Sequence, residues 1–172
     1  FLYLAYQPPH GTLVVPSLQP YTRKDYPSWR HKIWAALITR MDRQIGDIAS
    51  LLRELEIDSN TLVLVSSDNG YSACGYWGEN YGRKADAIHY RSFFDNKGPF
   101  RGGKSNLYEG GLRVPLIAWW PGTIRENSES DHLCTFWEFL PTACDLAGIE
   151  TNENTDGISF LQRATYDEVK WF

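Results

Sequence analysis

The segment "TLVLVSSDNG", residues 61–70, decides the fold, because an apolar run in it ends on an acid, an amide and a glycine. Residues 62–65 are all apolar instead of alternating with polar residues, which is typical of a strand covered on both faces in a parallel sheet. Asp68 and Asn69 follow this predicted strand directly. The rest of the chain indicates what a carboxylate and a carboxamide do there.

Two other runs, "FLYLAY" at residues 1–6 and "VPLIAWW" at 114–120, have the same continuous apolar character. Between the first run and residues 61–67, apolar residues recur at steps of three and four from Ile33 to Leu55, which predicts an amphipathic helix. A strand, a helix and a strand in this order cross over right-handed and place both strands parallel. We therefore predict an α/β fold with a mostly parallel sheet flanked by helices.

A second helix is predicted near residues 134–147. Its apolar stripe would consist of Phe136, Phe139, Leu140, Cys144 and Ala147. Gly148 would end this helix, and Pro141 would kink it or shift its start. No internal repeat or low-complexity tract interrupts the 172 residues, so we expect a single domain over residues 1–172.

Composition excludes several kinds of partner. The formal net charge is −4 and the chain has no block of Lys and Arg, so we expect no nucleic-acid partner. No apolar run approaches the length that crosses a bilayer, and we expect no membrane partner. The chain opens directly on a predicted strand, which leads us to expect truncation on the N-terminal side. A sheet that lacks strands has an open edge, where self-association can occur.

Polar side chains with possible chemistry gather after the predicted strands. Asp68 and Asn69 offer hard oxygen ligands of the kind that Ca²⁺ or Mg²⁺ prefers. The alternative is an Asx turn, since Asp-Asn-Gly is also common turn chemistry. His10 follows the first run in "QPPHG", and the carboxyl ends of parallel strands share one edge of a sheet. A loop histidine with a local hydrogen bond is the alternative for His10.

The segment "FRGGKSNLYEGG", residues 100–111, places Arg101 and Lys104 among four glycines. Such a loop lets a cation approach an oxyanion closely while backbone N–H groups stay free to help. The alternative is an ordinary flexible surface loop.

Taken together, five segments resemble the sulfatase family in order and spacing. They are "PPHG" at 8–11, "MDRQIG" at 41–46, "TLVLVSSDNG" at 61–70, "GPFRGGKSNLYEGGLRVPLIAWWPG" at 98–122 and "FLPTACDLAG" at 139–148. The chain is similar to the second half of the catalytic domain of a type I arylsulfatase, which implies an alkaline-phosphatase-like fold. The resemblance implies hydrolysis of a sulfate ester.

The resemblance also assigns roles to individual residues. Asp68 and Asn69 match the two later ligands of a single divalent cation, generally Ca²⁺, with Mg²⁺ as the alternative. Lys104 matches the lysine that contacts the sulfate and offsets charge on the leaving oxygen. His10 matches a histidine that contacts the ester and is a candidate proton donor. Three further matches, Arg101, Glu109 and Arg113, are interpreted as scaffold, with Arg113 paired to Glu109.

Some parts of the family's site are missing from this chain. The formylglycine nucleophile comes from a C/S-x-P-x-R motif, which no Cys or Ser of this sequence begins. We therefore expect the formylglycine in the parent protein and the chain alone to be inactive. Export to the periplasm, lysosome or extracellular space is implied by the family. Alternatives are a phosphodiesterase or phosphonate hydrolase of the same superfamily, which Asn69 disfavours, and a noncatalytic module that binds sulfated glycans.

The substrate is expected to be a sulfated carbohydrate or an aryl sulfate. The long connection after Gly70 departs from the family pattern and is rich in aromatic residues, which either line a pocket for the substrate or pack the loop. These residues are Tyr76, Trp77, Tyr81, His89 and Tyr90.

Overall fold

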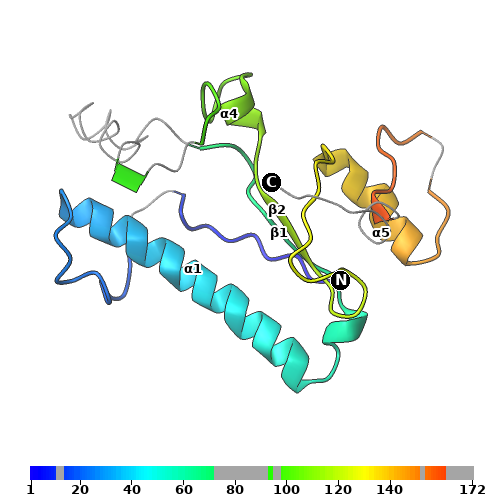
Figure 1. The fold of residues 1–172 in the computed structure, drawn as a ribbon, viewed down its shortest axis with the longest axis horizontal. Coiled ribbons are helices and arrows are strands. Elements are labelled where there is room, and N and C mark those ends of the chain that lie inside the picture. Colours follow the sequence, from blue (N-terminus) through cyan, green and yellow to red (C-terminus); the bar gives the residue numbers. More distant parts are fainter. Residues whose placement is uncertain (11–13, 72–92, 95–97, 152–153, 162–172) are drawn as a thin grey trace. The chain divides into compact units, whose positions relative to one another are not determined.

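The structure is a computed structural model that describes residues 1–10, 14–71, 93–94, 98–151 and 154–161. The chain divides into two compact units, Phe1–Ile57 and Asp58–Phe172. The first unit contains the long helix α1 (Trp29–Glu54) (Figure 1). The second contains, in chain order, the 3₁₀ turn η1 (Asp58–Asn60), strand β1 (Val63–Ser66), helix α4 (Glu109–Leu112), strand β2 (Leu116–Trp119), the 3₁₀ turn η2 (Phe136–Glu138) and helix α5 (Phe139–Leu146).

Helix α1 confirms the helix that the apolar periodicity predicts. Its buried residues are His31, Ile33, Ala35, Ala36 and Leu37, all in its N-terminal half. Toward its C-terminus the predicted stripe is half-buried at Met41, Ile45, Ile48 and Leu52, and only its last member, Leu55, is exposed, at 56%. None of the described helices combines the length and the apolar character needed to span a bilayer.

The segment before α1 folds back on the first turns of the helix. The hydroxyl of Tyr21 lies 2.7 Å from Oγ1 of Thr39, and Nζ of Lys32 donates to the carbonyl of Thr22 over 2.9 Å. These bonds tie the segment to the N-terminal half of α1. The buried part of the first unit therefore lies around the N-terminal half of α1.

The predicted strand at residues 1–6 is wrong. The segment forms no regular strand, and its large side chains are open to solvent, with Phe1 102% and Tyr3 78% exposed. The amide of Tyr6 donates to the carbonyl of Leu4 over 3.1 Å, within the segment itself. A strand exists through ladder bonds to a neighbouring strand, and apolar composition alone does not supply that neighbour.

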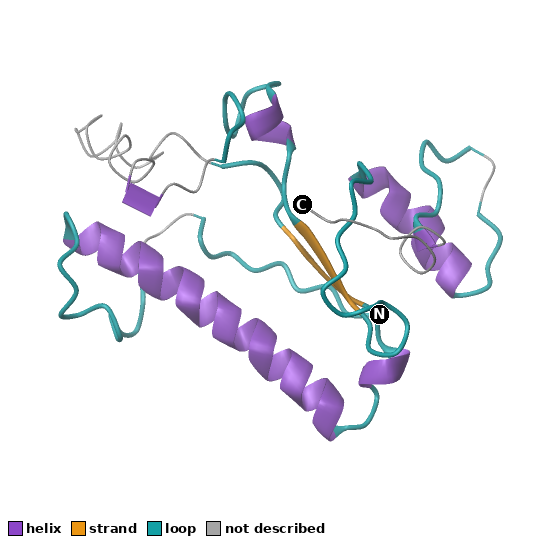
Figure 2. Cartoon of the chain, in the orientation of Figure 1, coloured by secondary structure: helices purple, strands orange, loops and turns teal. Residues whose placement is uncertain are grey.

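The other two predicted strands are confirmed as β1 and β2, which pair with each other (Figure 2). They run antiparallel, with Val63 opposite Trp119 and Ser66 opposite Leu116. The mostly parallel sheet expected from the sequence is therefore not found in the described residues. Residues 63–65 are half-buried and Ile117 is 60% exposed, so the pair is not covered on both faces. An apolar run predicts a strand but does not encode its direction.

The second predicted helix is confirmed, with a later start. Residues 136–138 form η2, and α5 begins at Phe139. Pro141 has no N–H to donate to the carbonyl of Trp137, which is why regular α-helical bonding starts after that turn. At the other end, the amide of Gly148 donates to Asp145 O over 3.1 Å and that of Ile149 to Cys144 O over 2.9 Å. These bonds satisfy the last helical carbonyls.

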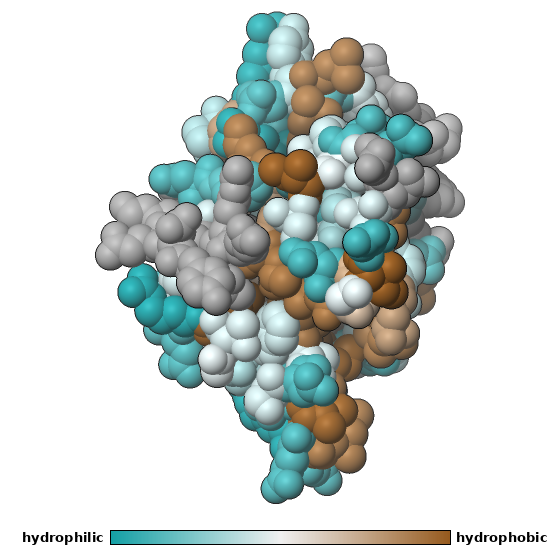
Figure 3. All heavy atoms as spheres, turned by 90° about the vertical axis from the view of Figure 1, so that its right-hand side faces the viewer, coloured by the Kyte–Doolittle hydropathy of each residue, from teal (hydrophilic) through white to brown (hydrophobic). Residues whose placement is uncertain are grey.

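The predicted apolar stripe of this helix is not its buried face. Phe136 and Leu140 are 61% and 58% exposed, and Figure 3 shows apolar side chains in brown at the surface. The buried positions are instead Glu138, Pro141 and Thr142. Thr142 receives a hydrogen bond from the amide of Phe160, because the segment after α5 returns over that side of the helix.

Candidate active site

The turn after β1 carries the two predicted metal ligands. Asp68 is exposed and Asn69 is half-buried, and Nδ2 of Asn69 donates to Oδ1 of Asp68 over 2.8 Å. The hydroxyl of Ser67 donates to the carbonyl of Asn69 over 2.9 Å, which closes the turn. In this arrangement the amide nitrogen of Asn69, and not its oxygen, faces the carboxylate of Asp68.

Two backbone hydrogen bonds dock the loop of Lys104 on this turn. The amide of Gly70 donates to the carbonyl of Gly111 over 3.0 Å, and the amide of Lys104 donates to the carbonyl of Tyr71 over 2.6 Å. Residues 100–113 therefore lie against the turn that follows Asn69, at the end of the strand pair where β1 finishes and β2 begins (Figure 1). The structure brings the backbone of Lys104 next to the turn of Asp68 and Asn69.

Glycines make this close docking possible. A Cβ atom on Gly70 would lie 2.0 Å from the carbonyl oxygen of Gly110, a distance that no side chain tolerates. The amides of Lys104, Gly110 and Gly111 all donate to backbone carbonyls nearby. The expectation that backbone N–H groups of this loop stay free for an oxyanion is therefore wrong for these three.

The scaffold interpretation of the loop's charged residues is supported by their contacts. Arg113 pairs through Nε with Oε2 of Glu109, which confirms the predicted pair. The guanidinium of Arg101 stacks on the ring of Tyr108, with Cζ 3.7 Å from the ring centroid, and Cζ of Arg113 lies 5.1 Å from that of Phe100. The two arginines thus fix the shape of the loop around Lys104, which is half-buried.

His10 lies in the first unit. It is exposed and ends a turn in which its amide donates to the carbonyl of Gln7 over 2.9 Å. Its role toward an ester remains a prediction. The aromatic residues predicted to line a pocket, from Tyr76 to Tyr90, lie outside the described residues.

The side-chain oxygens of Asp68 and Asn69 are of the chemical type that a hard divalent cation binds. Calcium takes six to eight oxygen ligands, so this pair would be only part of a coordination shell. Among the described residues no cluster of three or more His, Cys, Asp or Glu side chains is arranged to hold a metal. The remaining ligands would have to come from other parts of the protein.

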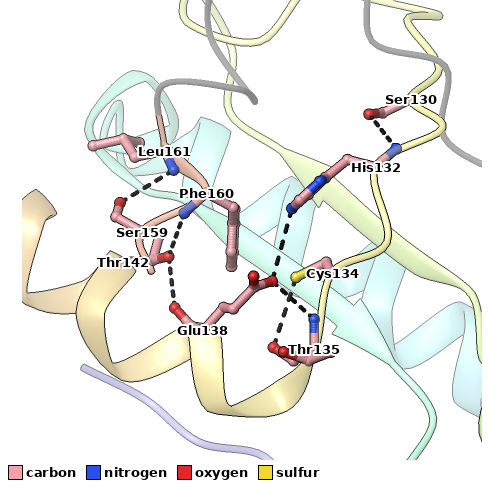
Figure 4. A network of polar contacts seen from close by, with 9 residues as sticks. All are labelled: Ser130, His132, Cys134, Thr135, Glu138, Thr142, Ser159, Phe160 and Leu161. Atoms are coloured by element: carbon pink, nitrogen blue, oxygen red, sulfur yellow. Dashed lines mark hydrogen bonds and ion pairs between the residues drawn. The ribbon is translucent and has the colours of Figure 1, made fainter. Parts of the chain in front are cut away.

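A second polar cluster, around Glu138, was not predicted from the sequence (Figure 4). The buried carboxylate of Glu138 accepts the amide of Thr135 over 2.9 Å and lies 3.7 Å from Nε2 of His132. Burial, followed by the hydrogen bond and charge of Glu138, raises the pKa of the nearby Cys134 thiol to about 12. The sequence signal was "TFWE", residues 135–138, a capping-box pattern. This cluster ties the segment before η2 to Glu138, where η2 leads into α5.

The sequence of the chain matches one protein family and several individual members of it. The profile of the family described as Sulfatase matches residues 1–149. The chain is 36% identical over 126 residues to N-acetylgalactosamine-6-sulfatase of Sus scrofa, covering 72% of this chain and 22% of that protein. It is 33% identical over 131 residues to steryl-sulfatase of Rattus norvegicus, covering 74% and 21% of the two chains.

One solved structure, Ps i-CgsB in complex with k-i-k-neocarrahexaose, matches with a TM-score of 0.75 and 28% identity. The match covers 94% of this chain and 32% of that one. The chain thus spans about a fifth of the length of the curated relatives, 22% of the first of them.

Proposed function

Because the chain belongs to the sulfatase family, we propose that it is part of a sulfuric ester hydrolase and carries one side of its active site. The observation that carries this proposal is the docking of the Lys104 loop on Gly70 and Tyr71, which directly follow Asp68 and Asn69, through backbone bonds of 3.0 Å and 2.6 Å. This docking supports a site in which the two proposed oxygen ligands and the lysine lie at one rim.

In this proposal Asp68 and Asn69 would hold the divalent cation, Ca²⁺ or Mg²⁺, at the end of β1. When bound, the cation supplies positive charge beside the oxygens of the ester. Lys104 binds the sulfate and offsets the negative charge that develops on the leaving oxygen, an interaction that is strongest in the transition state. His10 donates a proton to the departing alcohol.

The proposed substrate is a sulfated carbohydrate or an aryl sulfate. The names of the relatives support this class: one is an N-acetylgalactosamine-6-sulfatase and another a steryl-sulfatase. Asn69 favours sulfate over phosphate, because related enzymes acting on phosphate or phosphonate esters more often carry a histidine at that position. A single cation, a lysine and a histidine balance the one negative charge of a sulfate monoester.

We further propose that both units belong to one catalytic domain with an alkaline-phosphatase-like, mostly parallel sheet, of which β1 and β2 form a part. The match of one solved structure to 94% of the chain supports this arrangement. The formylglycine nucleophile would be supplied by a part of the parent protein outside this chain, and the 172-residue chain by itself would be inactive.

The test is an assay of the full-length protein on sulfate and phosphate esters of the same alcohol. We expect sulfate hydrolysis to dominate, and Lys104→Ala to lower kcat on the sulfate ester by about 10²- to 10³-fold, as removal of a charge-stabilising donor does. The exposed Lys24, on the loop before α1, gives a matched control, and Lys24→Ala should keep wild-type turnover.

Two results would contradict the proposal. Preference for the phosphate ester would favour the phosphodiesterase alternative. Turnover of Lys104→Ala within about tenfold of wild type would remove Lys104 from the site, since the loss expected for a single stabilising donor is larger.

A further inference from the structure

Two backbone carbonyls that flank Lys104, those of Gly103 and Asn106, pack against Gly111 in α4. A Cβ atom on Gly111 would lie 2.2 Å from the carbonyl oxygen of Asn106 and 2.5 Å from that of Gly103. The amide of Asn106 donates to Gly103 O over 3.1 Å, so residues 103–106 form a closed turn with Lys104 inside it. This turn therefore lies directly on the backbone of α4, with no side chain between.

Two further contacts hold the loop of Lys104: a backbone hydrogen bond to Tyr71 and the stacking of Arg101 on Tyr108. The amide of Lys104 donates to Tyr71 O over 2.6 Å, next to the metal-ligand turn. Outside, the Arg101 guanidinium stacks 3.7 Å from the centroid of the Tyr108 ring. Gly102 has a φ of +83°, and a Cβ atom added there would lie 2.9 Å from the Cβ of Tyr108. Only glycine therefore allows the backbone to approach Tyr108 this closely.

We propose that Gly111 and Tyr108 are positioning residues for Lys104. Gly111 sets how deeply the Lys104 turn sits on α4, and Tyr108 holds the start of the loop through Arg101. The inference rests on the proposed function, since it assumes that Lys104 acts on the ester. Misplacing a catalytic group by about 1 Å costs on the order of 10²-fold in rate, so an added methyl group at Gly111 should act on turnover.

A double-mutant cycle in the full-length protein tests this directly. Gly111→Ala should lower kcat on a sulfate ester by about 10²-fold, and the same change made in Lys104→Ala should lower it by less than about threefold, because residues that act as a unit are non-additive. KM should change little in either background, because Lys104 acts mainly in the transition state.

Gly157 gives a matched control in the same unit. A Cβ there would lie 2.4 Å from the carbonyl oxygen of Trp137, a clash similar to that at Gly111 but beside η2 and α5. Gly157→Ala should lower the urea midpoint of unfolding and leave the kcat of the folded enzyme unchanged. A loss of kcat in Gly157→Ala equal to that in Gly111→Ala would overturn the proposal, because general destabilisation would then explain both.

Tyr108→Ala covers the case in which Gly111→Ala does not fold. This change removes the ring below Arg101, keeps the Cβ that faces Gly102 and changes no charge. It should lower kcat in the wild-type background and leave it unchanged in Lys104→Ala. Equal losses in both backgrounds would overturn the positioning role and leave the proposed function intact. Wild-type turnover in Lys104→Ala alone would overturn both.

Discussion

The thiol of Cys134 has a raised pKa because it is partly buried and lies beside the carboxylate of Glu138. Its pKa is raised from 9.0 to about 12, first by burial and then by Glu138. Between these pH values the unfolded chain loses the thiol proton while the folded chain keeps it, so stability falls as pH rises. Below about pH 9 both states are protonated and the thiol contributes no pH dependence.

We therefore expect the free energy of unfolding of the wild type to fall faster above about pH 9 than that of Cys134→Ala. Urea denaturation at a series of alkaline pH values measures both slopes, and the variant controls for the ionisation of all other groups. Parallel slopes would show that Cys134 ionises equally easily in the folded and unfolded chains.

For individual residues, the contacts that could be predicted from the sequence are those between residues close together in the chain. Glu109 and Arg113 stand four residues apart, and this spacing brings two side chains together on even one helical turn. Glu138 was missed because the segment that returns over it is distant in the sequence: Gly157 packs directly on the Glu138 backbone, and Phe160 bonds to Thr142. Local spacing carries no information about such a contact.

Among the elements, α5 and the segment at Phe160 are joined by two side-chain hydrogen bonds, between Ser159 and Asp145 and through the buried hydroxyl of Thr142. Oγ1 of Thr142, a residue only 1% exposed, donates to Glu138 O over 2.7 Å and accepts the amide of Phe160 over 3.0 Å. Thr142→Val keeps the shape and leaves a buried amide without its acceptor, which costs roughly 1–3 kcal/mol.

Thr142→Ser is the matched control, because it keeps the hydroxyl and loses only a methyl group. Chemical denaturation should rank the proteins as wild type, then Ser, then Val in stability. A Val variant as stable as the Ser variant would mean that the hydroxyl does not hold the Phe160 segment.

How well each element could be predicted depends on where its hydrogen bonds go. Helix α1 bonds within itself, so the periodicity from Ile33 to Leu55 was enough to predict it, and the observed helix spans Trp29–Glu54. The segment at residues 1–6 has the composition of a strand but lacks a paired neighbour among the described residues. Strand direction was likewise not predictable, because β1 and β2 are joined by residues 67–115, a long connection whose path the apolar runs do not specify.

At the scale of the whole molecule, the chain supplies only part of the proposed metal site. Asp68 and Asn69 offer two of the six to eight oxygens that calcium requires. We expect the 172-residue chain alone to bind Ca²⁺ more weakly than about 0.1 mM, the range of incomplete or open sites. Calorimetry on the chain, with Asp68→Ala as control, measures this. Micromolar binding that Asp68→Ala leaves unchanged would place the calcium site elsewhere.

In the proposed site, two oxygen ligands and a lysine meet where the ester binds. A crystal structure of the full-length protein with Ca²⁺ and a sulfate ester tests this arrangement most directly. We expect one cation bound by the side-chain oxygens of Asp68 and Asn69, with Nζ of Lys104 and the ring of His10 within hydrogen-bond distance of the ester. A bound ester that contacts none of these side chains would contradict it.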